Sequence, residues 1–394
     1  MSSTVKKRKT TKKPWLKKNT KTPESTPNPS LPDDLLLSCF ARASRLYYPT
    51  LSLVSKSFAS LLAAPHLYQT RSSLGRTESC LYVCLRFPNE TNPRWFTLCQ
   101  KPDRTRTTNY TMQLRKKSSG YVLATVPIPH SPPNNVHKTG LVAVGSNIYN
   151  IGVSKAPSSS VSILDCTSHT WRQAPSMLIE RYCSAAGVVD GKIYVKGGCE
   201  DCNCTGCCCD SCMEILDPKT QTWELVSRSY GLVVRDCRFH RRAVINGKLY
   251  MVGNHGGLAY TVREGLCERL GRLFRLGWPS SSYSMINNVL YTYNGLFRWH
   301  DTEAGVWGDM KGLKGLPKFA SSGCVKLADY GGKMAVLWDK YLPCSEYKKK
   351  TIWCAVIALK RCSIHEIWGK VEWHDAVLTV PDSYEFVCAL ATTV

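Results

Sequence analysis

The sequence predicts a mainly β protein: a β-propeller with a small all-α module and a basic tail in front of it. Three observations carry this prediction. A unit of about 40–50 residues recurs over the C-terminal two-thirds of the chain, and short strand-like segments alternate within each copy. A segment near the N-terminus has apolar residues at helical spacing instead. The residues before that segment are mostly Lys, Thr, Ser and Pro.

Length and composition are those of a globular protein. The chain has 394 residues, of which 43% are hydrophobic and 21% charged, enough for two or three domains. The N-terminus lacks the apolar region of a signal peptide, and no apolar run approaches the ~18 residues of a membrane span. We therefore expect a cytoplasmic or nuclear protein that is not secreted and does not bind membranes. Most of the 20 cysteines should then be reduced.

The first 28 residues are predicted to be a disordered basic tail. Residues 1–30 hold nine Lys or Arg against Glu24 alone, a local net charge of +8 out of +23. The run Lys6–Lys9 suits nuclear localisation or loose attachment to a polyanion, and a solubilising tail is the alternative.

Residues 29–75 are predicted to form the helical module. Pro32 followed by Asp33 and Asp34 is a typical helix start, because acidic side chains suit the N-terminal end of the helix dipole. A further helix is expected from Pro49, with one apolar stripe through Val54 and Phe58, and Pro65 is expected to end it. A module this small and this apolar cannot bury all of its apolar side chains internally, which indicates a partner.

Residues 79–394 are predicted to form the propeller. VVDGKIYVKGG (188–198) matches VINGKLYMVGN (244–254), and weaker copies lie at 142–152, 284–294 and 327–338. Each copy predicts the paired inner strands of one blade. In three copies an Asp is followed six residues later by a Trp that is expected to pack between blades, at Asp165/Trp171, Asp217/Trp223 and Asp301/Trp307.

Five units are countable, and a sixth blade is favoured. It would combine strands within residues 80–100 with a last strand over Ser383–Thr392, taken from opposite ends of the chain. Such a blade would close the ring and remove exposed sheet edges.

The helical segment LPDDLL, followed by Tyr48, LSLVSKSF and HLY, resembles the F-box, and the repeats resemble kelch repeats. The order of elements resembles plant F-box/kelch-repeat proteins. The resemblance implies a non-catalytic substrate-recognition subunit of an SCF-type cullin-RING ubiquitin ligase. Its F-box would bind a Skp1-like adaptor and its kelch propeller the protein to be ubiquitinated. Carried over by position, the adaptor-binding residues are Leu31, Pro32, Leu35, Leu36, Leu51, Val54, Ser55, Phe58 and Leu61. The alternative is that these side chains form only the core of the module.

A cysteine-rich loop follows the second inner pair. Four thiolates at its Cys-x-x-Cys spacings could bind zinc. The other repeats have no such loop, however, so the fold itself does not require a metal there. The candidate metal ligands are Cys199, Cys202, Cys204, Cys207, Cys209 and Cys212. We expect no cofactor otherwise, and exposed free thiols or an unconstrained loop are the alternatives.

Basic residues precede the inner strands of several units. If they line one rim of the propeller, they would offer a surface for an acidic substrate segment; a solvated rim is the alternative. The candidates are His137, Arg181, Arg238, His240, Arg241 and Arg242.

Enzymatic motifs are lacking: the sequence has no P-loop, no Gly-x-Ser-x-Gly and no His-Glu-x-x-His. The alternative functions are a basic propeller that binds nucleic acid or another polyanion and, least expected, a metal-dependent propeller enzyme. Nucleic acid is disfavoured because the basic tail lacks interleaved stacking aromatics.

Overall fold

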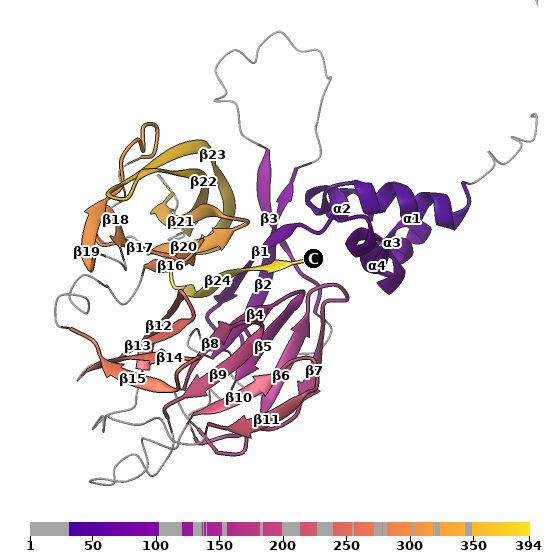
Figure 1. The fold of residues 1–394 in the computed structure, drawn as a ribbon. Helices are drawn as coiled ribbons and strands as arrows, with labels where there is room; N and C mark the ends of the chain where they lie inside the picture. Colours follow the sequence, from indigo (N-terminus) through magenta and orange to yellow (C-terminus); the bar gives the residue numbers. More distant parts are fainter. Residues whose placement is uncertain are drawn as a thin grey trace, which may run out of the picture.

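The computed structural model pairs a helical module with a six-bladed propeller (Figure 1). It describes residues 31–101, 120–128, 136, 138, 140–151, 156–181, 184–198, 213–226, 239–253, 256–271, 278, 282–301, 304–317, 319, 324–342 and 349–394. The basic tail, residues 1–28, lies outside the described residues. Within the described residues, no helix combines the length and the apolar character that crossing a membrane requires.

The module is built from short helical elements around one small core. These are α1 (Asp33–Arg42), the 3-10 turn η1 (Arg45–Tyr47), α2 (Tyr48–Leu51), α3 (Lys56–Ala63) and α4 (Pro65–Ser73). Apolar side chains from each α-helix meet in the core, which is centred on Phe40, Ala41, Tyr48, Leu62 and Leu67. The Tyr48 hydroxyl donates to the carbonyl oxygen of Phe40 at 2.8 Å, so the buried polar end of this side chain is satisfied.

The single helix predicted from Pro49 is interrupted. The chain leaves the helix after Leu51, and the Ser55 hydroxyl then caps α3 by accepting from the backbone N–H of Phe58 at 3.1 Å. A serine side chain can bind backbone N–H groups in this way and so begin a new helix. The spacing of apolar residues gives no sign of such a cap, so it could not predict the break. The break leaves Leu53 and Val54 in solvent. Pro65 begins α4 directly after α3 rather than only ending a helix.

Five blades follow one another along the chain, each a four-stranded antiparallel sheet. Blade 1 contains β4 (Leu141–Val144), β5 (Asn147–Ile151), β6 (Val161–Asp165) and β7 (Thr170–Ala174), and blade 2 contains β8 (Ala185–Val189), β9 (Lys192–Lys196), β10 (Glu214–Asp217) and β11 (Thr222–Leu225). Blade 3 contains β12 (Phe239–Ile245), β13 (Lys248–Gly253), β14 (Gly257–Thr261) and β15 (Leu266–Arg269), and blade 4 contains β16 (Tyr283–Ile286), β17 (Val289–Tyr293), β18 (Phe297–Asp301) and β19 (Val306–Asp309). Blade 5 contains β20 (Val325–Tyr330), β21 (Lys333–Tyr341), β22 (Lys349–Ser363) and β23 (Glu366–Pro381). The five repeats seen in the sequence are the β4–β5, β8–β9, β12–β13, β16–β17 and β20–β21 pairs.

The sixth blade joins the two ends of the propeller, as predicted, and confirms a six-bladed ring. Its strand order is β24 (Glu385–Thr393), β1 (Ser79–Arg86), β2 (Arg94–Gln100) and β3 (Tyr121–Thr125). The last strand runs antiparallel to β1, with Ser79 opposite Thr393 and Arg86 opposite Glu385. Glu78 and Val394 extend this pairing by two backbone hydrogen bonds, 2.8 and 2.9 Å long.

The outer tryptophans pack against the preceding blade, which is the role that their spacing predicts. The Trp171 ring lies 6.3 Å from that of Trp95 in blade 6, and the Trp223 indole donates to the Pro175 carbonyl at the end of blade 1. Trp307 packs against the core shared by blades 3 and 4. In blade 3 the corresponding position is Cys267, which packs against the core shared by blades 2 and 3. In blade 3 a smaller side chain, that of Cys267, therefore takes the position that Trp occupies in the clearer copies of the repeat.

Candidate functional site

Two apolar segments of the helical module face solvent. Leu31 and Leu35, at the start of α1, are 58% and 54% exposed, and Leu53 and Val54, between α2 and α3, are 83% and 63% exposed. We call these four residues the exposed apolar segments. A small domain gains stability by burying such side chains, at about 1.5–3 kcal/mol for each fully buried Leu or Val. Their exposure in this chain is what a docking surface requires.

The remaining predicted adaptor residues divide between surface and core. Pro32 and Ser55 are exposed, and Ser55 also caps α3. Leu36, Leu51, Phe58 and Leu61 are partly buried and pack against the module core. Phe58, for example, meets the Phe40 ring edge-on with centroids 4.9 Å apart. Leu53 was absent from the prediction because a continuous helix would have placed it off the apolar stripe.

Glu78 holds the module onto the propeller. Its carboxylate accepts from the Ser44 hydroxyl at 3.1 Å and from the Arg45 backbone N–H at 2.9 Å. The other carboxylate oxygen lies 3.4 Å from the guanidinium of Arg71, whose side chain is 1% exposed. Arg71 also donates to the carbonyl oxygen of Ala43, so one buried cation ties α4 to the end of α1. The charge-assisted contacts are the stronger kind of hydrogen bond and fix the module at the start of β1.

A second set of contacts reaches blade 1. The Arg45 guanidinium donates to the carbonyl oxygen of Cys166 at 3.2 Å, and the Tyr82 hydroxyl donates to the same oxygen at 3.1 Å. The Tyr82 oxygen also lies 3.0 Å from Nε2 of His169. Burial, followed by the charge of Arg45, lowers the pKa of His169 to about 4, so this imidazole is neutral at physiological pH. Module, blade 6 and blade 1 therefore form one connected unit.

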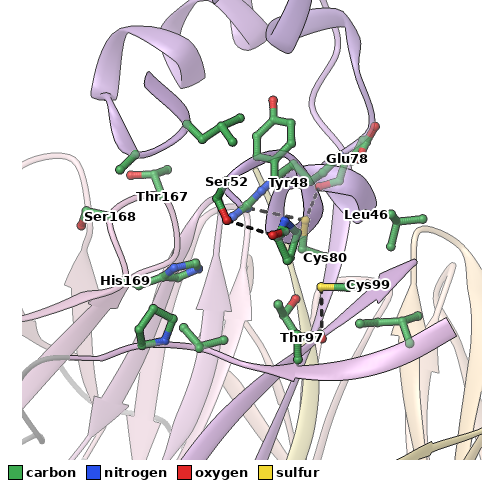
Figure 2. A pocket seen from close by; sticks show the side chains of 18 of the residues that line it. Leu46, Tyr48, Ser52, Glu78, Cys80, Thr97, Cys99, Thr167, Ser168 and His169 are labelled. Carbon is green, nitrogen blue, oxygen red and sulfur yellow. Dashed lines mark hydrogen bonds between the residues drawn. The ribbon is translucent and has the colours of Figure 1, made fainter. Parts of the chain in front are cut away.

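A cavity of about 400 Å³ lies beneath these contacts, between the helical module and the propeller. Figure 2 shows Tyr48 and Ser52 of the module on one side of it and Thr97, Cys99 and His169 of the propeller on the other. We call it the junction cavity.

The innermost strands of all six blades surround a central channel of about 340 Å³. An adjoining pocket of about 210 Å³ is lined by three cationic side chains, Lys138, Arg242 and Lys326. Burial and then the charge of Lys326 lower the pKa of Lys138, as expected where like charges are held together. We call these three residues the basic channel mouth. Such a surface suits an acidic segment of a partner.

The structure changes the set of basic rim residues. His240, Arg241 and Arg242 lie within β12 rather than before it. Of these, Arg242 lines the channel, where its guanidinium donates to the carbonyl oxygen of Lys138 at 3.1 Å. His137 and Arg238 lie outside the described residues.

Arg181 is not a surface residue. Its guanidinium pairs with Glu214 at 2.8 Å and donates to the Gly197 carbonyl at 2.9 Å, and both side chains of the pair are 0% exposed. The expectation that Arg181 contacts substrate is therefore corrected: the charge is used internally, where it ties the entry of blade 2 to β10.

The candidate zinc ligands of the cysteine-rich loop lie outside the described residues; they are Cys199, Cys202, Cys204, Cys207, Cys209 and Cys212. Among the residues that are described, no three His, Cys, Asp or Glu side chains gather as metal ligands would.

Comparison with known proteins covers both parts of the chain. The F-box domain family matches residues 29–70, and the family described as "FKB95, Kelch-repeats domain" matches residues 95–378. F-box/kelch-repeat protein At4g39550 of Arabidopsis thaliana is 58% identical over 406 residues, covering 100% of both chains. F-box/kelch-repeat protein At5g51250 of the same organism is 52% identical, covering 92% of this chain and 99% of its own. A solved structure titled "Structure of YjhT" covers 70% of this chain and 91% of its own at TM-score 0.41 and 12% identity, a likeness too weak to support a conclusion.

Proposed function

The chain belongs to the F-box/kelch-repeat family, and on this premise we propose that it is the substrate-recognition subunit of an SCF-type cullin-RING ubiquitin ligase. In this proposal the helical module binds a Skp1-like adaptor and the propeller holds the protein to be ubiquitinated. The chain performs no chemistry itself, because ubiquitin transfer belongs to the rest of the ligase. It would act in the cytoplasm, the nucleus or both.

The exposed apolar segments carry the proposal. Leu31, Leu35, Leu53 and Val54 face solvent although the module has a packed core of its own. A partner that buries a few aliphatic anchors in a groove gains most of its affinity from them. An adaptor that binds these segments would bury side chains that the propeller leaves free.

The rigid junction supports the same reading. Glu78, Arg45 and Arg71 fix the module to blades 6 and 1 through charged hydrogen bonds. A receptor must present its substrate at a defined place relative to the ligase, and a fixed junction provides that geometry. The basic channel mouth is the surface that we assign to an acidic substrate segment.

The test is capture of a purified plant Skp1-type adaptor by the full chain. We expect the Leu35→Asp, Val54→Asp double variant to weaken binding by at least about thirtyfold, which is the loss of a single anchor at about 2 kcal/mol. Leu178→Asp is the matched control, because Leu178 is 58% exposed, between Leu35 at 54% and Val54 at 63%, but lies in the propeller. Adaptor binding that survives the double substitution in a protein with unchanged melting temperature would contradict the proposal.

A polyanion-binding propeller is the second candidate, favoured by the basic channel mouth and the net charge of +23. It predicts binding to single-stranded nucleic acid that weakens steeply with salt and is independent of the exposed apolar segments. The salt dependence of nucleic-acid binding by the Leu35→Asp, Val54→Asp variant separates this function from the first.

A further inference from the structure

The junction cavity is partly open to solvent and measures about 400 Å³, with side chains of both the helical module and the propeller in its lining. That volume lies within the roughly 300–1,000 Å³ range of small-molecule sites. The hydrogen bonds of Glu78 and Arg45 already fasten the module to the propeller beside it.

The cavity contains one cation whose charge is not neutralised. The Arg45 guanidinium donates to the Cys166 carbonyl at 3.2 Å and to the Cys80 sulfur at 3.6 Å, and it lies 5.3 Å from the centre of the Tyr68 ring. All three partners are neutral, since burial raises the pKa of the Cys80 thiol. Among the described residues, no carboxylate oxygen lies within 4.0 Å of this guanidinium.

Glu78 supplies the acidic side chain of the cavity lining, and its oxygens are engaged elsewhere. They accept from the Ser44 hydroxyl and the Arg45 backbone N–H, and they pair with Arg71 at 3.4 Å. The Glu78 carboxylate is therefore paired with the Arg71 guanidinium, and the Arg45 guanidinium is left without a carboxylate in the lining. A partly buried cation in this position gains from an added anion. His169 is neutral at pH 7, so it adds no second charge.

The rest of the lining is mostly apolar. Leu46, Pro49 and Leu62 come from the module, and Leu98, Val126 and Pro127 come from blade 6. The lining combines this arginine with largely apolar walls and a few hydroxyl groups, among them those of Thr97 and Thr167, which suits a ligand with one anionic end and an apolar body. Because only one charge is unmatched, a monoanion fits this balance better than a phosphate.

We propose that the junction cavity binds a small amphipathic monocarboxylate, with its carboxylate on Arg45 and its apolar body between Leu62 and Val126. Because the walls come from both parts of the chain, the ligand stabilises the arrangement in which the module is docked on the propeller. The proposal is independent of adaptor binding.

The test uses the full chain without any partner. Octanoate, phenylbutanoate and naphthoate are each titrated against their methyl esters by calorimetry, and melting temperatures are recorded in parallel. We expect at least one acid to bind with Kd below about 1 mM and to raise the melting temperature, and its ester to bind at least tenfold more weakly. Inorganic phosphate should not compete.

Two variants assign the site. Arg45→Gln keeps donors near Cys166 but removes the charge, and it should weaken acid binding by about tenfold to a hundredfold. Ala59→Phe fills the cavity from α3 without touching Arg45, and it should abolish binding while the melting temperature holds or rises. Arg86→Gln is the control, because Arg86 pairs with Glu385 on the surface.

Failure of all three acids to bind the folded wild-type protein would overturn the proposal, as would equal binding by acid and ester or unchanged binding in Ala59→Phe. Capture of the adaptor is measured separately, so the loss of one proposal leaves the other standing.

Discussion

Arg181 and Glu214 form an ion pair 2.8 Å long in which neither side chain touches solvent. The Glu214 carboxylate also accepts from the backbone N–H groups of Leu178 and Ile179, at 2.6 and 3.2 Å, so it organises the chain that enters blade 2. We expect Glu214→Ala to destabilise the protein by about 3–5 kcal/mol, because it leaves Arg181 charged and enclosed.

The matched control for Glu214→Ala is Glu372→Ala, which breaks the surface pair with Lys333 at 2.7 Å. An exposed pair of this kind contributes at most about 1 kcal/mol. Equilibrium unfolding in urea measures the free energy of unfolding of both variants. Equal losses would show that burial does not make the Arg181–Glu214 pair more stabilising than an exposed pair.

The closing strand makes a second prediction. A chain that ends at Asp382 lacks β24 and leaves the edge of β1 unpaired. We expect it to aggregate and to lose cooperative thermal unfolding. A synthetic peptide of residues 384–394 should restore a monomeric peak in size-exclusion chromatography and raise the melting temperature. A truncated chain that stays monomeric and unfolds as the full chain does would contradict the assigned role of β24.

Acid sensitivity of the junction is the third prediction. The folded-state pKa of His169, about 4, lies below its ordinary value near 6.5, so the unfolded state binds more protons between these pH values. The contribution of His169 is therefore complete above pH ~6.5 and falls as the pH drops towards ~4. Urea unfolding of the wild type at pH 7 and pH 5 should show a loss of stability to which His169 contributes about 1–2 kcal/mol.

The variant that isolates this effect is His169→Asn. The residue has φ of 56°, a conformation that Asn accepts more readily than most side chains, and Asn does not titrate. We expect a smaller loss of stability between pH 7 and pH 5 in this variant. The pKa of His300 is also lowered to about 4, by burial, so some pH dependence should remain.

Charge at the channel mouth gives the fourth prediction. Lys326→Gln removes one of the three cations that line the pocket, and it should weaken binding of a polyglutamate peptide and reduce the salt dependence of that binding. Lys370→Gln, an exposed residue of β23, is the control and should leave both unchanged. Fluorescence anisotropy at two salt concentrations measures this, and identical loss in both variants would point to non-specific attraction.

The blades could be predicted from the sequence because the ring repeats the same local structure, a pair of apolar strands joined by a tight turn. The tight turn around Gly191 recurs around Gly247, and each lies between two strands whose apolar residues must be buried against a neighbouring blade. The sixth blade followed from the need to leave no open sheet edge. Cys267 shows the limit of this reasoning, since packing accepts a side chain that no longer matches the repeat.

The site was less predictable, because its properties depend on contacts between distant residues. The Ser55 cap was hidden beneath an apolar stripe, and with it the exposure of Leu53. Arg181 looked like a rim residue until its partner Glu214, 33 positions away, was seen to enclose it. Arg45 carried no signal at all, since only folding brings it to the Cys166 carbonyl.

The pairing of Ser79 with Thr393 also has a consequence for biosynthesis. The helical module and β1 precede blades 1 to 5 along the chain, whereas β24, the partner of β1, follows all five of them. Contacts between residues so far apart in sequence form slowly, and an unpaired strand edge is prone to aggregate until its partner pairs with it. Every nascent chain therefore exposes its helical module and the unpaired edge of β1 before the propeller ring is complete.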